Sequence, residues 1–447
     1  MVQWGKKEAA DMKRLVSGLL AAMLLAGSAA ALEPISQPIA TSGYTYYAIQ
    51  ADGTLLAWGD SFHGAVGPAD QDPLPWEEAN ALLENARYVD AGYIMAAAID
   101  EDGVLWGWGG HAGRTFGEEE PYRLLEDVVS VSVGERTCAA LRTDGTVWTW
   151  GARSGQSLAE NEDDPSYPPT QVLDHAVQLF GDLVVKEDGT LIRVWFDGDT
   201  CTTAPLMEHV AAVGSLYCGM QDPAMLVQGL DGSLWRVPWK NNQSDSIQWQ
   251  SLGRPEKMLE DVVQFTSRTA VTADGTLWAW GDQRPAMLRD GRVDPEDPYD
   301  QESYSDIVRI TDGVVSAVVC SDRTLAVLAD GSLWQLPSAA FRPEWETSPD
   351  RSPAVPEKLL DQVRMPSPPP AWTADAPAPA VVESASLEAW EARQEAAAPE
   401  PDATASVPAR EETPPESTWE QGLLELGVLA ASLAGLVLAA WLRGRKR

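Results

Sequence analysis

The chain has 447 residues and a formal net charge of −35, and 44% of its residues are hydrophobic. This share supports a large buried core and excludes a chain that is disordered throughout. Basic residues are few, with clusters at 6–14 and 443–447, so the composition offers no basic face for nucleic acid and excludes it as a ligand.

Residues 1–31 are predicted to form a secretory signal peptide. Lys13 and Arg14 precede an apolar run at 15–26, and a series of small residues follows that run. This order of positive charge, apolar run and small-residue cleavage site is typical of export signals, and a buried helix is the alternative. The signal is complete from Met12 onward, which we take as the natural start.

One phrase, seen as TADGTLWAWG at 272–281, returns along the chain. Successive Asp-Gly pairs are 42 to 56 residues apart, and their aspartates are Asp52, Asp102, Asp144, Asp188, Asp231, Asp274 and Asp330. A period in the forties indicates one structural unit that is repeated seven times.

Each unit is predicted to be a strand, a tight turn and a second strand. Asp-Gly between apolar runs favours a hairpin, because both residues tolerate the positive φ of a type I′ turn. The second strand carries Thr and Trp on one face and Leu or Val on the other, so both faces need cover. Neighbouring sheets in a ring supply that cover. We therefore predict an all-β, seven-bladed propeller over residues 36–365.

The tryptophans of this propeller are expected to pack between blades, and an aromatic platform for sugar is the alternative. A last segment at 357–365, EKLLDQVRM, parallels the opening of a repeat although no Asp-Gly pair follows it. We predict that this segment joins the blade begun by residues 36–59. Hydrogen bonds between the two ends of the domain would then close the ring.

The C-terminal part is predicted to tether the propeller to a membrane. Residues 366–422 are rich in Pro, Ala and Glu and are expected to be a disordered stalk. An apolar run within 423–442 suits one transmembrane helix, and the basic tail at 443–447 places that end in the cytoplasm. A wall-sorting signal ends similarly, but its LPxTG-like motif is missing. The propeller would thus lie outside the cell.

The four cysteines leave two interpretations open. Cys138 and Cys218 each follow a glycine by four residues, which favours two unpaired, buried strand residues. In an exported chain disulfides are also permitted, and Cys201 with Cys218 is then the favoured pair. The spacing of Cys and His does not suggest zinc.

Three phrases carry a family resemblance: WGDSFHGAVG (58–67), WGGHAGRTFG (108–117) and the longer VVSVSVGERTCAALRTDGTVWTWG (128–151). They resemble repeats of the regulator of chromosome condensation 1 (RCC1) family. The resemblance implies an RCC1-like propeller and a platform for protein contacts. Its nucleotide-exchange activity does not carry over to an exported, acidic chain. Three repeats depart from the family pattern, with Trp195, Pro238 and Pro337 in place of the closing glycine.

The sequence offers no catalytic constellation, cofactor motif or metal site. None of the four histidines lies beside a nucleophile or at ligand spacing from another, and no Ser-His-Asp order, HExxH or P-loop occurs. Asp-rich stretches lack the ligand spacing of a calcium loop. We therefore expect a non-catalytic protein.

Acidic insertions follow the Trp-Gly phrase in several repeats, and equivalent insertions emerge on one rim of a propeller. The predicted acidic rim comprises Asp70, Asp72, Glu118, Glu119, Glu120, Glu162, Asp163, Asp164, Asp294, Glu296, Asp297 and Asp300. Its partner would be a cationic extracellular protein or polymer. Solvated loops without a binding role are the alternative for these residues. For the whole protein, the alternatives are an exported hydrolase or lyase using the propeller funnel and a structural envelope protein.

Overall fold

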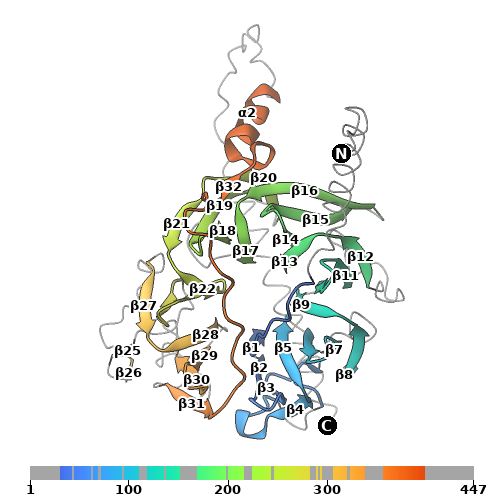
Figure 1. Ribbon diagram of the computed structural model, residues 1–447, viewed down its shortest axis with the longest axis vertical. Coiled ribbons are helices and arrows are strands. Elements are labelled where there is room, and N and C mark those ends of the chain that lie inside the picture. Colours follow the sequence, from blue (N-terminus) through green and yellow to red (C-terminus); the bar gives the residue numbers. More distant parts are fainter. Residues whose placement is uncertain are drawn as a thin grey trace, which may run out of the picture. The chain divides into compact units, whose positions relative to one another are not determined.

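The computed structural model describes residues 31–42, 45–61, 64–68, 72–92, 95–109, 118–134, 137–151, 169–197, 200–215, 224–242, 246–281, 288–289, 292–293, 306–319, 323–337 and 356–397. Seven antiparallel sheets of four or more strands follow one another around a ring (Figure 1). The predicted all-β, seven-bladed propeller is confirmed.

The first three blades have four strands each, in chain order. The first contains β1 (Ile39–Ser42), β2 (Thr45–Ile49), β3 (Leu55–Gly59) and β4 (Asn80–Leu83), with the short helix η2 (Trp76–Glu78) before β4. The second contains β5 (Ala86–Ala91), β6 (Met95–Asp100), β7 (Leu105–Gly109) and β8 (Glu118–Leu125). The third contains β9 (Val128–Val133), β10 (Thr137–Arg142), β11 (Val147–Gly151) and β12 (Thr170–Leu173).

The other four blades repeat this order with additions. The fourth contains β13 (Ala176–Phe180), β14 (Leu183–Lys186), β15 (Leu191–Asp197) and β16 (Thr200–Glu208). The fifth contains β17 (Val210–Ser215), β18 (Ala224–Gly229), β19 (Leu234–Asn242), β20 (Ser246–Leu252) and β21 (Glu256–Leu259). The sixth contains β22 (Val262–Phe265), β23 (Thr269–Thr272), β24 (Leu277–Ala279) and β27 (Val308–Thr311), plus the hairpin β25 (Leu288–Arg289) and β26 (Arg292–Val293). The seventh contains β28 (Val314–Val319), β29 (Arg323–Leu328), β30 (Leu333–Pro337) and β31 (Glu357–Leu360).

The Asp-Gly turns join the second and third strands of every blade, as predicted. The predicted type I′ geometry is wrong, because the aspartates of these turns do not have positive φ and the N–H of the glycine itself closes the turn, as Gly53 does on the carbonyl oxygen of Gln50 at 2.9 Å. Their glycines have positive φ values, for example +91° at Gly53 and +82° at Gly232, which explains the choice of glycine. In an antiparallel blade these turns share an end with the links between successive blades. We call that side of the ring the turn face.

Four tryptophans, six residues after the turn aspartates, pack between blades as predicted. Their side chains are at most 4% exposed, and they are Trp58, Trp108, Trp150 and Trp280. Each joins the hydrophobic cluster of the preceding blade; Trp108, for example, packs with Tyr47 and donates from Nε1 to the carbonyl oxygen of Ala65 at 2.9 Å. The tryptophans two residues earlier in five of the repeats are only half-buried; they are Trp106, Trp148, Trp235, Trp278 and Trp334.

Both ends of the domain build the inner strand of the first blade. Val363 forms a bridge with Gln50, and the N–H of Arg364 donates to the carbonyl oxygen of Ile49 at 2.8 Å. Residues 39–42 then continue that strand as β1, while β31 pairs with β30 in the seventh blade. The predicted closure by hydrogen bonds is therefore confirmed for residues 362–364, whereas residues 357–360 complete the seventh blade.

Residues 363–397, which we call the strap, correct the predicted stalk. This segment crosses the ring to the fourth and fifth blades and contains β32 (Ala380–Val381), η5 (Glu383–Ala385) and α2 (Leu387–Ala397) (Figure 1). The expectation of disorder is thus wrong for residues 366–397. Apolar side chains such as Trp372 and Ala385 find partners on distant blades, which local composition cannot reveal. Residues 398–422 lie outside the described part of the chain.

Candidate protein-binding face

An acidic residue occupies the link between each blade and the next. The seven are Glu84, Glu126, Asp174, Glu208, Glu260, Asp312 and Asp361. In six links the following residue has a positive φ, which turns the chain into the next blade; these residues are Asn85, Asp127, His175, His209, Asp261 and Gly313. The seven acids, the link acids hereafter, therefore recur at one position around the turn face.

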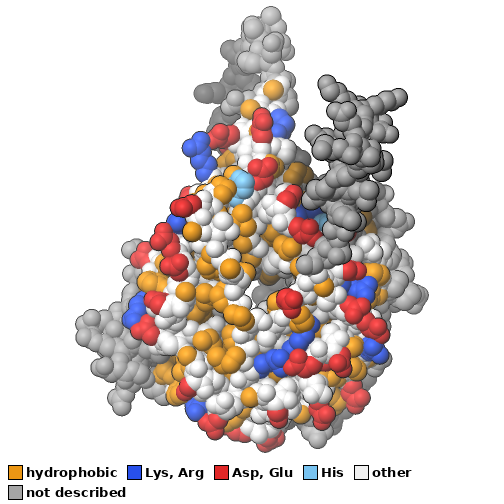
Figure 2. Space-filling model, in the orientation of Figure 1, with side chains coloured by type: hydrophobic (Ala, Val, Ile, Leu, Met, Phe, Trp, Pro, Cys, Tyr) orange, Lys and Arg blue, Asp and Glu red, His pale blue; other side chains and the backbone are white. Residues whose placement is uncertain are grey.

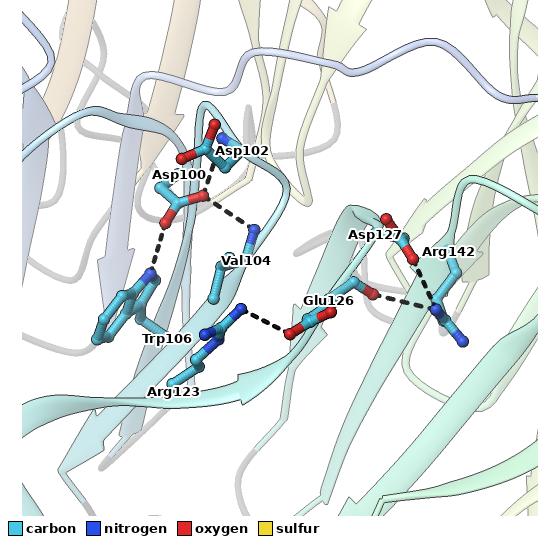
Figure 3. A network of polar contacts seen from close by, with 8 residues as sticks. All are labelled: Asp100, Asp102, Val104, Trp106, Arg123, Glu126, Asp127 and Arg142. Atoms are coloured by element: carbon cyan, nitrogen blue, oxygen red, sulfur yellow. Dashed lines mark hydrogen bonds and ion pairs between the residues drawn. The ribbon is translucent and has the colours of Figure 1, made fainter.

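The second blade shows how the turn beside a link is built (Figure 3). Oδ1 of Asp100 accepts hydrogen bonds from the backbone N–H groups of Asp102 and Val104 at 3.0 and 2.9 Å. Its Oδ2 accepts a third from Nε1 of Trp106 at 2.9 Å. The half-buried tryptophan is thus fixed by its own turn and covers the blade edge.

The neighbouring link acid is held by two arginines (Figure 3). Nη2 of Arg123 lies 2.6 Å from Oε1 of Glu126, while Nε of Arg142 donates to the Glu126 carbonyl oxygen at 3.0 Å. Nη2 of Arg142 also pairs with Asp127 at 2.9 Å. Because the side chains of Arg123 and Glu126 are more than half exposed, their ion pair contributes at most about 1 kcal/mol to stability.

The same ladder of tryptophan, base and acid returns in three other blades. The bases face the tryptophans across the sheet, in the pairs Trp106–Arg123, Trp235–Lys257, Trp278–Arg309 and Trp334–Lys358. Each base pairs with the link acid three residues later. Four link acids thus have a basic partner, and the side chains of these bases are 39–56% exposed.

The turn aspartates add further negative charge to this face. The pKa values of Asp52 and Asp188 lie below the ordinary value, chiefly because the backbone N–H groups of Thr54 and Thr190 donate to their carboxylates. These carboxylates therefore remain ionised into the acidic range. Figure 2 shows acidic side chains around the edge of a face whose centre is richer in hydrophobic ones.

The described inner strands β1, β5, β9, β13, β17, β22 and β28 contain few ionisable residues, namely Arg87, Tyr88 and Asp90, and Arg364 belongs to the closing segment of the first inner strand. Arg87 is 3% exposed, and burial lowers its pKa, while its guanidinium donates to the carbonyl oxygens of Ile35 and Val128 at 2.5 and 2.6 Å. Loss of surrounding water raises the pKa of Asp90 to about 7, although the N–H of Val133 donates to Oδ2 at 2.8 Å. These three residues serve blade contacts.

Two glutamines join other pairs of blades in the way that Asp90 joins the second and third. Gln178 donates to the carbonyl oxygen of Val213 and accepts from its N–H, at 2.9 and 3.1 Å. Gln264 makes the same two bonds to Ala317, at 3.0 and 3.2 Å. An amide suits this position because it both donates and accepts.

In the sequence, the predicted acidic rim falls between the third strand of a blade and the end of its fourth. Of its residues, Asp72 accepts a hydrogen bond from the N–H of Ser61 at 3.0 Å, and Glu118, Glu119 and Glu120 begin β8. The remaining predicted residues lie outside the described part of the chain; they are Asp70, Glu162, Asp163, Asp164, Asp294, Glu296, Asp297 and Asp300. The rim stays a prediction.

Sequence reasoning missed the link acids, although a signal exists. The phrases at the links are LENA, LEDV, LDHA, MEHV, LEDV, TDGV and LDQV, each with an acid in its second place. Aligning the repeats on this phrase as well as on Asp-Gly would have identified the ring of acids.

The described residues test the predictions on cysteines, metal ligands and the membrane helix only in part. Cys138 is buried in β10, as expected for a strand residue, and both it and Cys201 are free thiols; Cys218 lies outside the described residues. Within the described segments no three His, Cys, Asp or Glu side chains gather as metal ligands. No helix there is long and apolar enough to cross a membrane, and 423–442 falls outside them.

A sequence model of the regulator of chromosome condensation (RCC1) repeat matches residues 128–155, the third repeat. This match confirms the resemblance to the RCC1 repeat family. No curated protein sequence matches the chain.

Three solved structures are similar to this chain. Yeast RCC1 (Prp20), solved with Kap60 bound, is 17% identical with a TM-score of 0.50, and the match covers 75% of this chain and 86% of that one. Prp20p from Saccharomyces cerevisiae is 16% identical with a TM-score of 0.48, covering 81% and 96%. Human WBSCR16 is 17% identical with a TM-score of 0.43, covering 63% and 83%.

Proposed function

We propose that this RCC1-like propeller is an exported, membrane-anchored and non-catalytic module that binds a cationic protein or polymer. The ring of seven link acids carries the proposal, because equivalent carboxylates on one face create a negative potential that attracts a cationic ligand. Yeast RCC1, which has a similar fold, was solved with Kap60 bound, so a protein with this fold is known to bind another protein.

Two acidic surfaces compete for this role, and a pair of equal-charge variants separates them. One variant carries Glu84→Gln, Glu126→Gln, Asp174→Asn and Glu260→Gln on the turn face. The other carries Asp294→Asn, Glu296→Gln, Asp297→Asn and Asp300→Asn in the predicted rim. Since both lose four charges, any difference in binding reflects position and not net charge.

The probe is poly-L-lysine of defined length, titrated at low and high salt by calorimetry. We expect the turn-face variant to bind at least about fivefold more weakly at low salt, and the difference to vanish at high salt. Equal weakening of binding in both variants would mean that binding depends on the net charge of the protein and not on the position of the acids. A larger loss in the rim variant would move the site to the predicted rim.

The proposed anchoring has its own test. A tag after Arg447 should resist protease added to intact cells, whereas a tag near Ala397 should be cut. Cleavage of the C-terminal tag would contradict a single-pass anchor with the propeller outside.

A further inference from the structure

The last part of the strap lies along β16 of the fourth blade and β20 of the fifth, and we call this docking place the groove. β32 pairs with the outer edge of β16 through only two residue pairs, Met207 with Val381 and Glu208 with Ala380. The N–H of Val382 then donates to the carbonyl oxygen of Leu206 at 3.0 Å. This segment adds one short strand to an exposed sheet edge, a recurrent mode of peptide recognition.

Apolar side chains fix the position of this strand. Ala385 is 2% exposed within a cluster that includes Leu206 and Leu252, and the half-buried Val381 and Val382 pack against the same cluster. The groove therefore accepts two consecutive β-branched residues. It also accepts a small residue three positions after the second of them. Charged or larger side chains at these places would lose that burial.

The far end of the groove is basic, and the strap is acidic there. Nη2 of Arg254 lies 2.9 Å from Oε1 of Glu388, and Nζ of Lys240 lies 3.3 Å from Oε1 of Glu391. Nζ of Lys240 also stands 4.8 Å from the ring centre of Trp390. The groove thus matches an apolar strand that continues into an acidic helix.

The chain between the ring closure and this groove has few attachments. Pro368, Pro369, Pro370 and Ala371 are exposed, and among the described residues no hydrogen bond joins these four to the ring. The strap contacts the ring again at Trp372, whose indole packs on Gly232. The N–H of Thr373 then donates to the carbonyl oxygen of Leu230 at 2.9 Å. The bound segment is consequently tethered at high effective concentration and can leave without opening the ring.

We propose that this groove is a peptide-binding site for a partner's extended segment of the pattern Val-Val-x-x-Ala followed by an acidic helix. The strap is its resident intramolecular ligand. A partner segment of the same chemistry displaces it. This inference does not depend on the acidic turn face, so the two can fail separately.

The test uses a truncated form of the protein, a cleavable form of the full chain and a fluorescent peptide of residues 371–397. In the first form, a stop after Pro370 empties the groove and keeps all seven blades and the closure at Val363. In the second, a protease site inserted between Pro370 and Ala371 is cut after folding. The uncut protein is the control, and fluorescence anisotropy reports binding.

We expect the peptide to bind the truncated or cut protein at least about a hundredfold more tightly than the uncut one, because the tethered strap blocks the groove. A Val381→Asp peptide should bind at least tenfold more weakly. Lys240→Glu with Arg254→Glu in the protein should weaken binding about threefold at low salt only.

Two results would overturn the proposal. One is that the peptide binds neither the truncated nor the cut protein, which makes the strap an integral part of the blades. The other is that the Val381→Asp peptide binds as well as the unchanged one. Should the truncated form fail to fold, the cut form alone decides between these outcomes.

Discussion

The second and third blades differ from the fourth and fifth in how their outer edges are finished. In the former, the repeat phrase is intact, and the half-buried Trp106 and Trp148 cover the edges beside Asp100 and Arg142. In the latter, Trp195 and Pro238 replace the closing glycine. Their third strands, β15 and β19, have seven and nine residues where β7 and β11 have five, and the strap docks on β16 and β20. In the fourth and fifth blades, the departures from the repeat pattern thus coincide with the place where the strap docks.

The largest effect should come from opening the ring, because the closed ring holds both pairs of blades in place. Truncation at Pro353 removes β31 and the bridge between Val363 and Gln50, so the first and seventh blades lose their shared hydrogen bonds. We expect the melting temperature, followed by circular dichroism, to fall by more than about 10 °C. A stop after Pro370 is the control and should cost only a few degrees. An unchanged melting curve for the Pro353 truncation would contradict the closure.

A second experiment compares two tryptophans. Trp108 is fully buried between the first and second blades, whereas Trp195 is half-buried beneath Arg193. Trp108→Ala should lower the free energy of unfolding by about 3–5 kcal/mol, and Trp195→Ala by about 1 kcal/mol, because only the first leaves a large cavity. Urea denaturation measures both. Equal losses would mean that the irregular blades depend on their tryptophan as much as the regular ones.

A third prediction concerns pH at the inner strands. The second blade contacts the third through the carboxylate of Asp90, but the fourth contacts the fifth through the amide of Gln178. Because the pKa of Asp90 in the folded protein, about 7, lies above its ordinary value, this residue costs stability as pH rises from about 4 to 7. Asp90→Asn should remove a loss of up to about 4 kcal/mol over that window, since each unit of pKa difference corresponds to about 1.4 kcal/mol.

The measurement is the free energy of unfolding of both proteins at pH 4.5, 6 and 8. The difference between them cancels the pH dependence of all other groups. A variant that follows the wild-type protein at every pH would show that Asp90 keeps its ordinary pKa.

The smallest effect should distinguish two turn glycines with nearly equal φ, +80° at Gly103 and +82° at Gly232. Alanine at either position costs about 1 kcal/mol of backbone strain. A Cβ at Gly103 would lie 3.6 Å from its nearest neighbour, but one at Gly232 would lie 2.8 Å from the Trp372 ring. Gly232→Ala should therefore also make the strap more sensitive to limited proteolysis at 368–371. Equal cleavage rates in both variants would show that the contact of Trp372 with Gly232 does not help to hold the strap in place.

Much of the ring follows from local pattern. Asp-Gly turns, the buried tryptophans such as Trp108 and the number of blades all depend on residues within one repeat, and each could be predicted. The closing hydrogen bonds were also predictable, because 357–365 repeats the phrase at the other blade links. The same phrase contains the link acids, which an alignment of the repeats on Asp-Gly alone does not single out.

The strap and Asp90 could not be predicted in this way. Composition assigns 366–397 to a stalk because its apolar residues are sparse and show no period. Val381 and Ala385 gain their burial from Leu206 and Leu252, which lie far away in sequence. For Asp90 likewise, an apolar strand with one acid gives no indication of how much water its carboxylate loses.

The two-part inner strand of the first blade also sets an order for folding. Gln50 leaves the ribosome or the export channel more than three hundred residues before Val363, its partner in the ring. Until that late residue arrives, the first blade lacks the start of its inner strand and the seventh has no neighbour on one side. Folding of the ring can therefore finish only after the whole propeller sequence has been delivered, and a chain interrupted before residue 363 exposes two open blades to proteases.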